Sequence, residues 1–330
     1  MEKHRLMHSW QTDEFGEVSK VLQLRELPVP DPGKGEALVK VMISSLGLPD
    51  KLAVEGDYPY VPNPPVTPGQ EFVGIVEKAG LDFPYAEGTK ILGSSEYYGK
   101  GYGAAADYTI CSKTTALPFP DEQAVAFPGT YQVAYVGLVD RASIKQGESL
   151  LVLGAAGRTG SAAVQLGKAF GAKVIAIVRK DEQKEYCFTQ GADYVLNSTD
   201  ENLIEKVMEL TNDKGADVIY DTVGGEAHKS VINAIAYKGR VILVGFAGGS
   251  WPEINPQHIM FKGYAVMGAL NTVRTDEEKQ NAINNFSEFI RNGYIQPPKA
   301  KLFDFTDTIS AMSEIGNSSG GIAIQVNREI

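Results

Sequence analysis

The chain has 330 residues, 43% of them hydrophobic and 22% charged, and a formal net charge of −10. This length and composition are typical of a globular protein with two domains, each large enough to bury a core. The excess of negative charge argues against a nucleic-acid-binding face, because phosphate binding requires clustered positive charge. No run of apolar residues is long enough for a signal peptide or a membrane span, so we expect a cytoplasmic protein.

Potential metal ligands are few and scattered. The two cysteines, Cys111 and Cys187, lie far apart, and the four histidines are not grouped at ligand spacing. A structural zinc site needs about four close Cys or His ligands, and a catalytic site needs about three. We therefore predict no metal site. Two distant cysteines also form no disulfide framework, which favours a reducing compartment.

The N-terminal part, residues 1–125, is rich in short apolar runs, glycine and proline. Residues 36–47 and 71–80 are predicted strands. Residues 57–69 contain five prolines and are predicted to form a loop, because proline has no backbone N–H and a fixed φ. This part is therefore predicted to be an irregular, mostly antiparallel β domain.

The middle part, residues 127–267, alternates short apolar runs with helical patterns. The runs are 149–155, 173–178, 193–197, 217–223, 240–246 and a sixth at 264–270. Nearly continuous apolar runs of this length are typical of parallel strands that are buried on both faces. The regular alternation predicts an α/β unit with a doubly wound parallel sheet.

The last part, residues 271–330, has an amphipathic helical pattern near 276–292 and a strand-like run at 321–326. One helix and one strand cannot bury a core alone, so they must pack onto an earlier domain. Packing onto the β domain would make that domain discontinuous in sequence.

A glycine-rich turn, GAAGRTG, lies between the first predicted strand and helix of the middle part, at residues 154–160. Gly157 allows the backbone to approach a pyrophosphate, and Gly160 allows the helix to pack closely on the strand. Ala155 replaces the first glycine of the usual G-x-G-x-x-G pattern; it preserves the turn if its φ is negative, and Gly154 adds freedom. The alternative is a turn that only packs the helix on the sheet.

The second predicted strand ends in Arg179 and Lys180. NAD-binding folds usually place an acid near this point for the ribose hydroxyl, whereas a 2′-phosphate requires a cation, above all a guanidinium. The pair therefore predicts NADPH as cofactor; the alternative is a solvated basic pair before a helix. Arg158, within the turn, either contacts a phosphate or extends into solvent.

Several segments together resemble the zinc-free quinone oxidoreductases of the medium-chain dehydrogenase/reductase superfamily. They are GLPDKLAVEGDYP (47–59), PGQEFVGIVEKAG (68–80), PGTYQVAYVGL (128–138), GAAGRTGSAAVQLGKAFGAKVI (154–175), VIYDTVGG (218–225) and GRVILVGFAGG (239–249). The resemblance implies a GroES-like, mostly antiparallel β catalytic domain at 1–126 with 271–330, a Rossmann domain at 127–270, and a cleft between them. It also implies a metal-free, often dimeric enzyme that reduces quinones or activated alkenes with NADPH. Gln70 stands where zinc alcohol dehydrogenases have a histidine ligand.

The resemblance also carries site residues over to this chain. Family cofactor contacts fall on Ala155, Ala156, Gly157, Arg158 and Thr159 in the glycine turn, on Arg179, on Phe246 and Ala247, and on Ala269, Leu270 and Asn271. Tyr58 corresponds to a residue that faces the nicotinamide or the substrate, and Tyr131 is a further candidate. The chain departs from the family at Gly47, Ala105 and Val133, where polar or bulky groups are lost around the substrate space, which favours an unusual or large acceptor.

The expected chemistry is hydride transfer to a conjugated carbonyl compound. Negative charge develops on the acceptor oxygen, so a hydrogen-bond donor aimed at that oxygen lowers the barrier. Tyr58 is the predicted donor, or else it lines the cleft as an aromatic wall. Asp50 either orients donors and relays a proton or is a surface charge. The predicted substrate is a quinone; the alternatives are C=C reduction of alkenals, enones or enoyl thioesters, and a non-catalytic NADPH-binding sensor.

Overall fold

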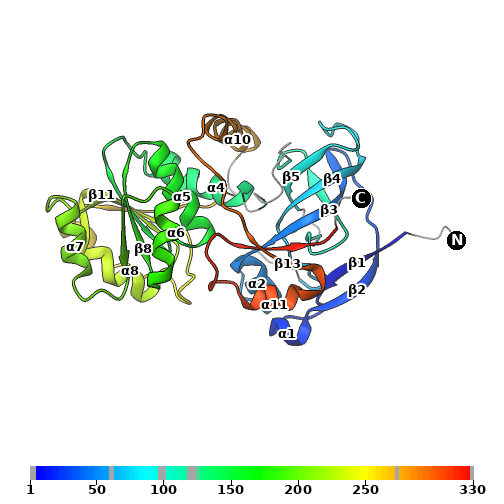
Figure 1. Cartoon of the computed structure of the whole chain (residues 1–330), viewed down its shortest axis with the longest axis horizontal. Coiled ribbons are helices and arrows are strands. Elements are labelled where there is room, and N and C mark those ends of the chain that lie inside the picture. Colours follow the sequence, from blue (N-terminus) through cyan, green and yellow to red (C-terminus); the bar gives the residue numbers. More distant parts are fainter. Residues whose placement is uncertain are drawn as a thin grey trace. The chain divides into compact units, whose positions relative to one another are not determined.

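The computed structural model describes residues 5–58, 63–95, 102–116, 125, 127–271 and 275–327. The chain divides into two compact units (Figure 1). The first, here called the β unit, comprises Met1–Gly129 and Pro298–Ile330, and the second, the α/β unit, comprises Thr130–Pro297. Both chain ends, blue and red in Figure 1, therefore belong to the same unit.

The β unit is built around one long strand, β3. It pairs antiparallel with three others, and the sheet order is β13-β14-β3-β4-β5, with β6 also on β3. The strands are β3 (Glu36–Leu46), β4 (Glu71–Ala79), β5 (Lys90–Ser94), β6 (Tyr108–Ser112), β13 (Lys301–Asp304) and β14 (Ile322–Gln325). β13 and β14 form the one parallel pair of this sheet in the described residues. The expectation of a mostly antiparallel β domain is confirmed.

Several smaller elements complete the β unit. They are the antiparallel pair β1 (Leu6–Gln11) and β2 (Gln23–Pro28), the helices α1 (Val18–Val21), α2 (Leu48–Glu55) and α11 (Thr308–Ser313), and the 3₁₀ turn η6 (Phe305–Asp307). Trp10 joins the N-terminal and C-terminal segments, because its indole N–H donates to the Phe305 carbonyl at 2.8 Å. Ala105 is fully buried in the same core cluster as Trp10, so its small side chain is a packing feature of this unit.

The α/β unit contains a six-stranded, all-parallel sheet in the order β12-β11-β10-β7-β8-β9. The strands are β7 (Ser149–Leu153), β8 (Lys173–Val178), β9 (Tyr194–Asn197), β10 (Ala216–Asp221), β11 (Ile235–Leu243) and β12 (Ala265–Gly268). All six predicted runs form these strands, and the predicted Rossmann fold is confirmed. The central strand β7 is buried along its whole length, as its continuous apolar sequence requires.

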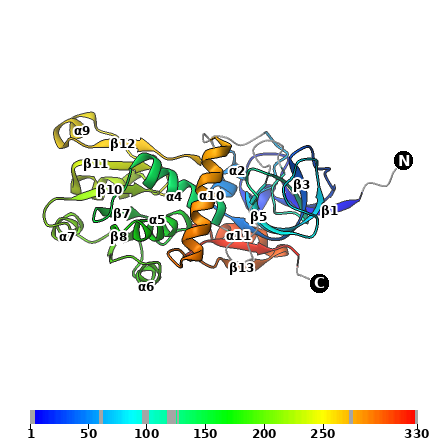
Figure 2. The same cartoon turned by 90° about the horizontal axis from the view of Figure 1, so that it is seen from above.

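Helices connect these parallel strands (Figures 1 and 2). They are α5 (Arg158–Ala169), η3 (Asp181–Gln183), α6 (Lys184–Thr189), α7 (Leu203–Leu210), α8 (Gly225–Val231), η4 (Ile232–Ala234) and α9 (Pro256–Lys262). The unit begins within α4 (Phe127–Tyr135), which continues as the π-helix η2 (Val136–Arg141), and it ends after α10 (Asp276–Arg291). No helix in the described part of the chain is long and apolar enough to cross a membrane.

Helix α10 groups with the α/β unit, whereas the predicted boundaries assigned residues 271–297 to the β domain. Figure 2 shows α10 alongside α4, and the Phe286 ring packs edge-to-face on Tyr131 and Tyr135, with centroids 6.0 and 5.5 Å away. The amide of Asn285 donates to the Tyr135 hydroxyl at 2.8 Å. The amphipathic pattern correctly predicted the helix, but the aromatic residues that it covers lie about 150 positions earlier in the chain.

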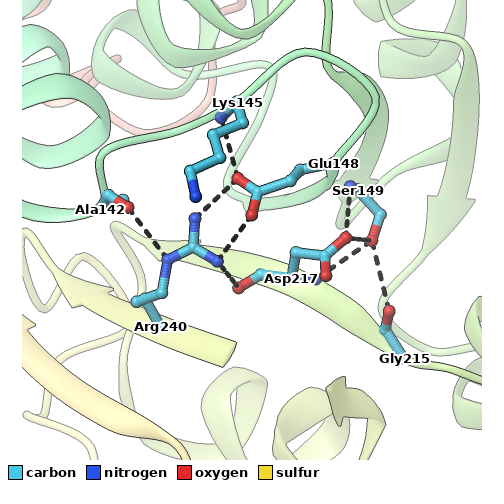
Figure 3. A network of polar contacts seen from close by, with 7 residues as sticks. All are labelled: Ala142, Lys145, Glu148, Ser149, Gly215, Asp217 and Arg240. Carbon is cyan, nitrogen blue, oxygen red and sulfur yellow. Dashed lines mark hydrogen bonds and ion pairs between the residues drawn. The ribbon is translucent and has the colours of Figure 1, made fainter. Parts of the chain in front are cut away.

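A polar network ties the amino ends of the central strands together (Figure 3). Arg240 of β11 forms a two-pronged ion pair with Glu148, at 3.0 and 2.7 Å, and also donates to the carbonyls of Ala142 and Asp217. The Asp217 carboxylate accepts from the backbone N–H and the hydroxyl of Ser149, both at 2.8 Å. This network joins β7, β10 and β11 at the edge of the sheet opposite to the glycine turn.

Candidate active site

The glycine turn follows β7 and opens α5. Gly154 has φ +68°, in the left-handed region, and a Cβ there would come within 2.5 Å of Thr222 Oγ1. Ala155 is not among the residues with positive φ, and its side chain is fully buried. The tight turn therefore rests on Gly154, one position earlier than in the usual pattern, which is why alanine is accepted at position 155.

The N-terminus of α5 has backbone N–H groups where an anion could lie close to the chain. Gly157 is the N-cap residue, and no side chain in the described part of the chain caps this helix. The first N–H groups of a helix have no intrahelical acceptor, so they are available to phosphate oxygens. A Cβ on Gly160 would lie 2.2 Å from the Gly154 carbonyl oxygen, so only glycine lets α5 approach the turn this closely. The roles predicted for Gly157 and Gly160 fit this geometry.

Arg179 and Lys180 directly follow β8, and both side chains are exposed. β8 is the parallel neighbour of β7, so this segment and the glycine turn lie at the same edge of the sheet. The backbone N–H groups of both residues donate to Gln183 Oε1, at 3.3 and 3.2 Å. The nearby acid, Asp181, is engaged by other groups: hydrogen bonds from Asn197 and Lys184, at 2.8 and 2.9 Å, hold its pKa below the usual value.

Hydrogen bonds of Thr222 link the loops that follow β7, β10 and β11. Its hydroxyl donates to the Leu153 carbonyl at 2.8 Å, and its own carbonyl accepts from Ala247 N–H at 3.1 Å. The next residue, Val223, likewise accepts from Gly248 N–H at 2.8 Å. The predicted cofactor residue Ala247 is therefore positioned by Thr222, which the sequence prediction did not assign although the VIYDTVGG segment contains it.

Asp221 and His228 hold the loop that carries Thr222. Asp221 is fully buried, and one carboxylate oxygen accepts from the N–H groups of Val223 and Gly224, at 2.9 and 2.8 Å. The other oxygen lies 2.9 Å from Nδ1 of the buried His228. These contacts give the loop a defined shape at the carboxyl end of β10, where ligands bind in open parallel sheets.

The remaining predicted cofactor residues follow β11 and β12. Phe246 packs against Trp251 with ring centroids 4.7 Å apart, and Ala269 N–H donates to Leu243 at 2.9 Å. Leu270 and Asn271 are half-buried. The side-chain oxygen of Asn271 is buried and has no hydrogen-bond partner among the described residues. A buried acceptor without a partner is costly, so this position fits a ligand group that donates a hydrogen bond.

Two of the three predicted catalytic residues have structural roles in this fold. Asp50 is buried at the start of α2, where its carboxylate accepts from the N–H groups of Gly47, Gly69 and Gln70 at 2.7, 2.8 and 3.1 Å. Both carboxylate oxygens of Asp50 are thus engaged by backbone donors. Asp50 is 1% exposed, so its interpretation as a surface charge is wrong, whereas its role in orienting donors or relaying a proton stays a prediction.

Tyr131 lies in the core of the α/β unit and is 1% exposed. Its hydroxyl donates to Gln165 Oε1 at 2.8 Å, and burial raises its pKa well above the ordinary value. This position argues against the prediction that Tyr131 contacts substrate. Tyr58, by contrast, is only partly buried in the β unit, where it packs against Ala53 and Val66.

The residues of the described part of the chain do not assemble a zinc site. No three His, Cys, Asp or Glu side chains in that part come together as ligands. Burial raises the pKa of Cys187 to about 12, so this thiol stays protonated near neutral pH.

Comparisons with known proteins agree with this architecture. Residues 33–121 match the family model "Alcohol dehydrogenase GroES-like domain", and residues 159–288 match "Zinc-binding dehydrogenase". The human quinone oxidoreductase is 30% identical over 320 residues, which cover 96% of each chain.

Solved structures show the same fold. A mycobacterial protein in complex with NADPH superposes with a TM-score of 0.88 at 24% identity, covering 97% of this chain and all of the other. The CurK enoyl reductase superposes with a TM-score of 0.86 at 19% identity, covering 97% and 99%. With its GroES-like and Rossmann units and a full-length relative at this identity, the chain belongs to the quinone oxidoreductase family of the medium-chain dehydrogenase/reductase superfamily and is an NAD(P)H-dependent oxidoreductase.

Proposed function

We propose that the protein transfers hydride from NADPH to a quinone or a similar conjugated carbonyl compound. The observation that carries the cofactor choice is the cation pair Arg179–Lys180 at the end of β8, beside a glycine turn with an uncapped helix start. The similarity to the human quinone oxidoreductase supports the acceptor class. Bound NADPH supplies the hydride; the protein supplies placement and electrostatics.

In this proposal, loops at the carboxyl ends of the parallel strands and residues of the β unit each have a role. The first N–H groups of α5 bind the pyrophosphate, and Arg179 and Lys180 bind the 2′-phosphate. Asn271 Oδ1, the buried acceptor after β12, takes a hydrogen bond from the nicotinamide amide. Tyr58 donates to the acceptor oxygen that gains negative charge. The donor set for zinc is absent from the described residues, and Gln70 stands at the expected ligand position, so the proposed reaction is zinc-independent.

The acceptor is identified by measuring NADPH oxidation with quinones, alkenals, enones and enoyl thioesters, together with product analysis. We expect the quinones to have the highest kcat/KM. Faster turnover of alkenals or enoyl thioesters would establish C=C reduction instead, the activity named for the CurK enoyl reductase, whose fold is the same. Tight NADPH binding without turnover of any acceptor would establish a sensor.

Replacing Arg179 with aspartate tests the cofactor assignment. Charge-assisted hydrogen bonds contribute about 1.5–3 kcal/mol, so R179D is expected to weaken NADPH binding about 100-fold and NADH binding less than threefold. Isothermal titration calorimetry measures both dissociation constants. Lys214→Asp is the matched control, because it makes the same charge change just before β10, at the other edge of the sheet. Equal losses for NADPH and NADH in R179D would contradict the assignment.

We further propose that the protein is a homodimer formed through the α/β unit. β12 is an edge strand that pairs only with β11 in the described residues. Next to it, Tyr237, Met260 and Phe261 are 75%, 68% and 81% exposed. Large exposed apolar side chains beside an open strand edge favour burial against another chain, and a second copy of β12 provides an identical edge.

A further inference from the structure

A short chain of hydrogen bonds leads from α6 into the glycine turn. The Tyr186 hydroxyl lies 3.0 Å from Ser161 Oγ, and Ser161 Oγ lies 2.7 Å from the Gly157 carbonyl oxygen. Ser161 Oγ also lies 3.3 Å from the Ala155 carbonyl oxygen, and when its one proton is directed at the carbonyls of the turn, it accepts a hydrogen bond from the Tyr186 hydroxyl. Burial raises the pKa of Tyr186 to about 12, so the tyrosine keeps this proton at neutral pH.

The same pair of helices has a second polar contact one turn further on. Gln165 of α5 donates to Gln190, the C-cap residue of α6, at 2.5 Å. Ser161 and Gln165 are four residues apart, as are Tyr186 and Gln190, so each pair lies on one face of its helix. Gln165 is itself held by Tyr131 and Gln296. The second contact therefore anchors α6 to the unit, and the Tyr186–Ser161 contact is the one that reaches the turn.

Tyr186 also lies close in sequence to the proposed 2′-phosphate residues. Gln183, one turn before it, accepts hydrogen bonds from the backbone N–H groups of Arg179 and Lys180. The segment that carries these cations thus leads through η3 into α6. Ser161, on the other side of the contact, is fully buried and holds the carbonyl of the N-cap residue Gly157.

We infer that Tyr186 is a positioning residue that holds the glycine turn and the β8–α6 segment at the separation that one NADPH molecule spans. This inference rests on the proposed binding of NADPH. A ligand that engages both segments gains affinity from their fixed placement, because the second contact forms at a high effective concentration. A ligand that engages only one segment does not depend on that placement. The contact should therefore increase the preference for NADPH over NADH.

The test compares four ligands in the wild-type protein and in Y186F, S161A and the double variant. NADPH spans both segments, NADH and ADP-ribose engage the turn without a 2′-phosphate, and adenosine 2′-monophosphate engages the cation segment. Loss of one neutral hydrogen bond changes an equilibrium about threefold to tenfold. We expect Y186F to weaken NADPH binding by that factor and to change binding of the other three ligands less than twofold. kcat at saturating NADPH should be unchanged while KM for NADPH rises.

The double variant should bind NADPH no more weakly than S161A, because both substitutions remove the same contact. Tyr194→Phe is the control; Tyr194 is an exposed tyrosine on β9, and its ring packs under Lys173. Unchanged NADPH affinity in Y186F, or an equal loss for all four ligands, would overturn the inference and leave the proposed function intact. If the wild-type protein binds NADPH no more tightly than NADH, both fail.

Discussion

Tyrosine residues of this chain show how surroundings determine the role of a side chain. Tyr131 has its hydroxyl committed to Gln165 inside the α/β unit, whereas Tyr58 is partly exposed in the β unit. Both match family segments, and both have the chemistry of a donor. A hydroxyl that is buried and already donating is poorly placed for an acceptor that enters from solvent, so the proposed donor is Tyr58 and not Tyr131.

Removing each of these hydroxyls separates the two roles. We expect Tyr58→Phe to lower kcat about 100-fold with little change in NADPH affinity, because a donor to developing negative charge acts mainly in the transition state. Tyr131→Phe should leave kcat unchanged and lower the free energy of unfolding by about 1 kcal/mol. Steady-state kinetics and urea unfolding measure both. If Tyr58→Phe keeps full activity, Tyr58 is only an aromatic wall.

At the scale of elements, the two edges of the parallel sheet serve different purposes. The carboxyl edge holds loops that are linked to one another through Thr222 and shaped by small residues such as Gly154 and Gly160. The amino edge holds the Arg240–Glu148 pair, which is largely shielded from solvent (Figure 3). Binding is therefore expected to depend on the first edge, and stability on the second.

Two substitutions test this division of roles. Thr222→Val keeps the shape of the side chain but removes the hydrogen bond to Leu153, so it should weaken NADPH binding about fivefold. Arg240→Gln should lower the free energy of unfolding by about 1–3 kcal/mol, because Glu148 and two carbonyl groups lose their donor, while NADPH affinity stays the same. Calorimetric titration and chemical denaturation of both variants measure these effects. A loss of NADPH affinity in Arg240→Gln would show that the edges are not independent.

At the scale of the whole molecule, the chain builds the β unit from both of its ends. β14 pairs antiparallel with β3, and their residues are separated by the entire α/β unit. Exposed apolar side chains on the α/β unit are the basis of the proposed dimer. Tyr237 lies near the C-terminal end of α9. Its neighbour Lys238 donates its backbone N–H to the carbonyl of Gly263, the C-cap residue of α9, at 2.9 Å.

Replacing Phe261 with aspartate tests the proposed dimer. The chain has a mass of 35.6 kDa, and light scattering should give twice this value for the wild-type protein and the single-chain mass for Phe261→Asp. Burying an unpaired charge in the interface is costly enough to shift the equilibrium to monomers. Leu81→Asp, an exposed leucine in the β unit, is the control. A light-scattering mass of a single chain for the wild-type protein would contradict the dimer.

The sequence by itself determined the order of strands and helices in the α/β unit, the position of the glycine turn and the cation pair after β8. These features depend on local periodicity and on conformational limits of single residues. The tertiary structure decided the roles of residues whose partners are distant in sequence: Asp50 with Gly69, Tyr131 with Gln165, and Thr222 with Leu153, which are 19, 34 and 69 positions apart. It also decided that α10 packs in the α/β unit, and it showed the strand β13, which the sequence pattern did not predict. Burial and hydrogen-bond partners follow from which segments the fold brings together, and no local pattern contains that information.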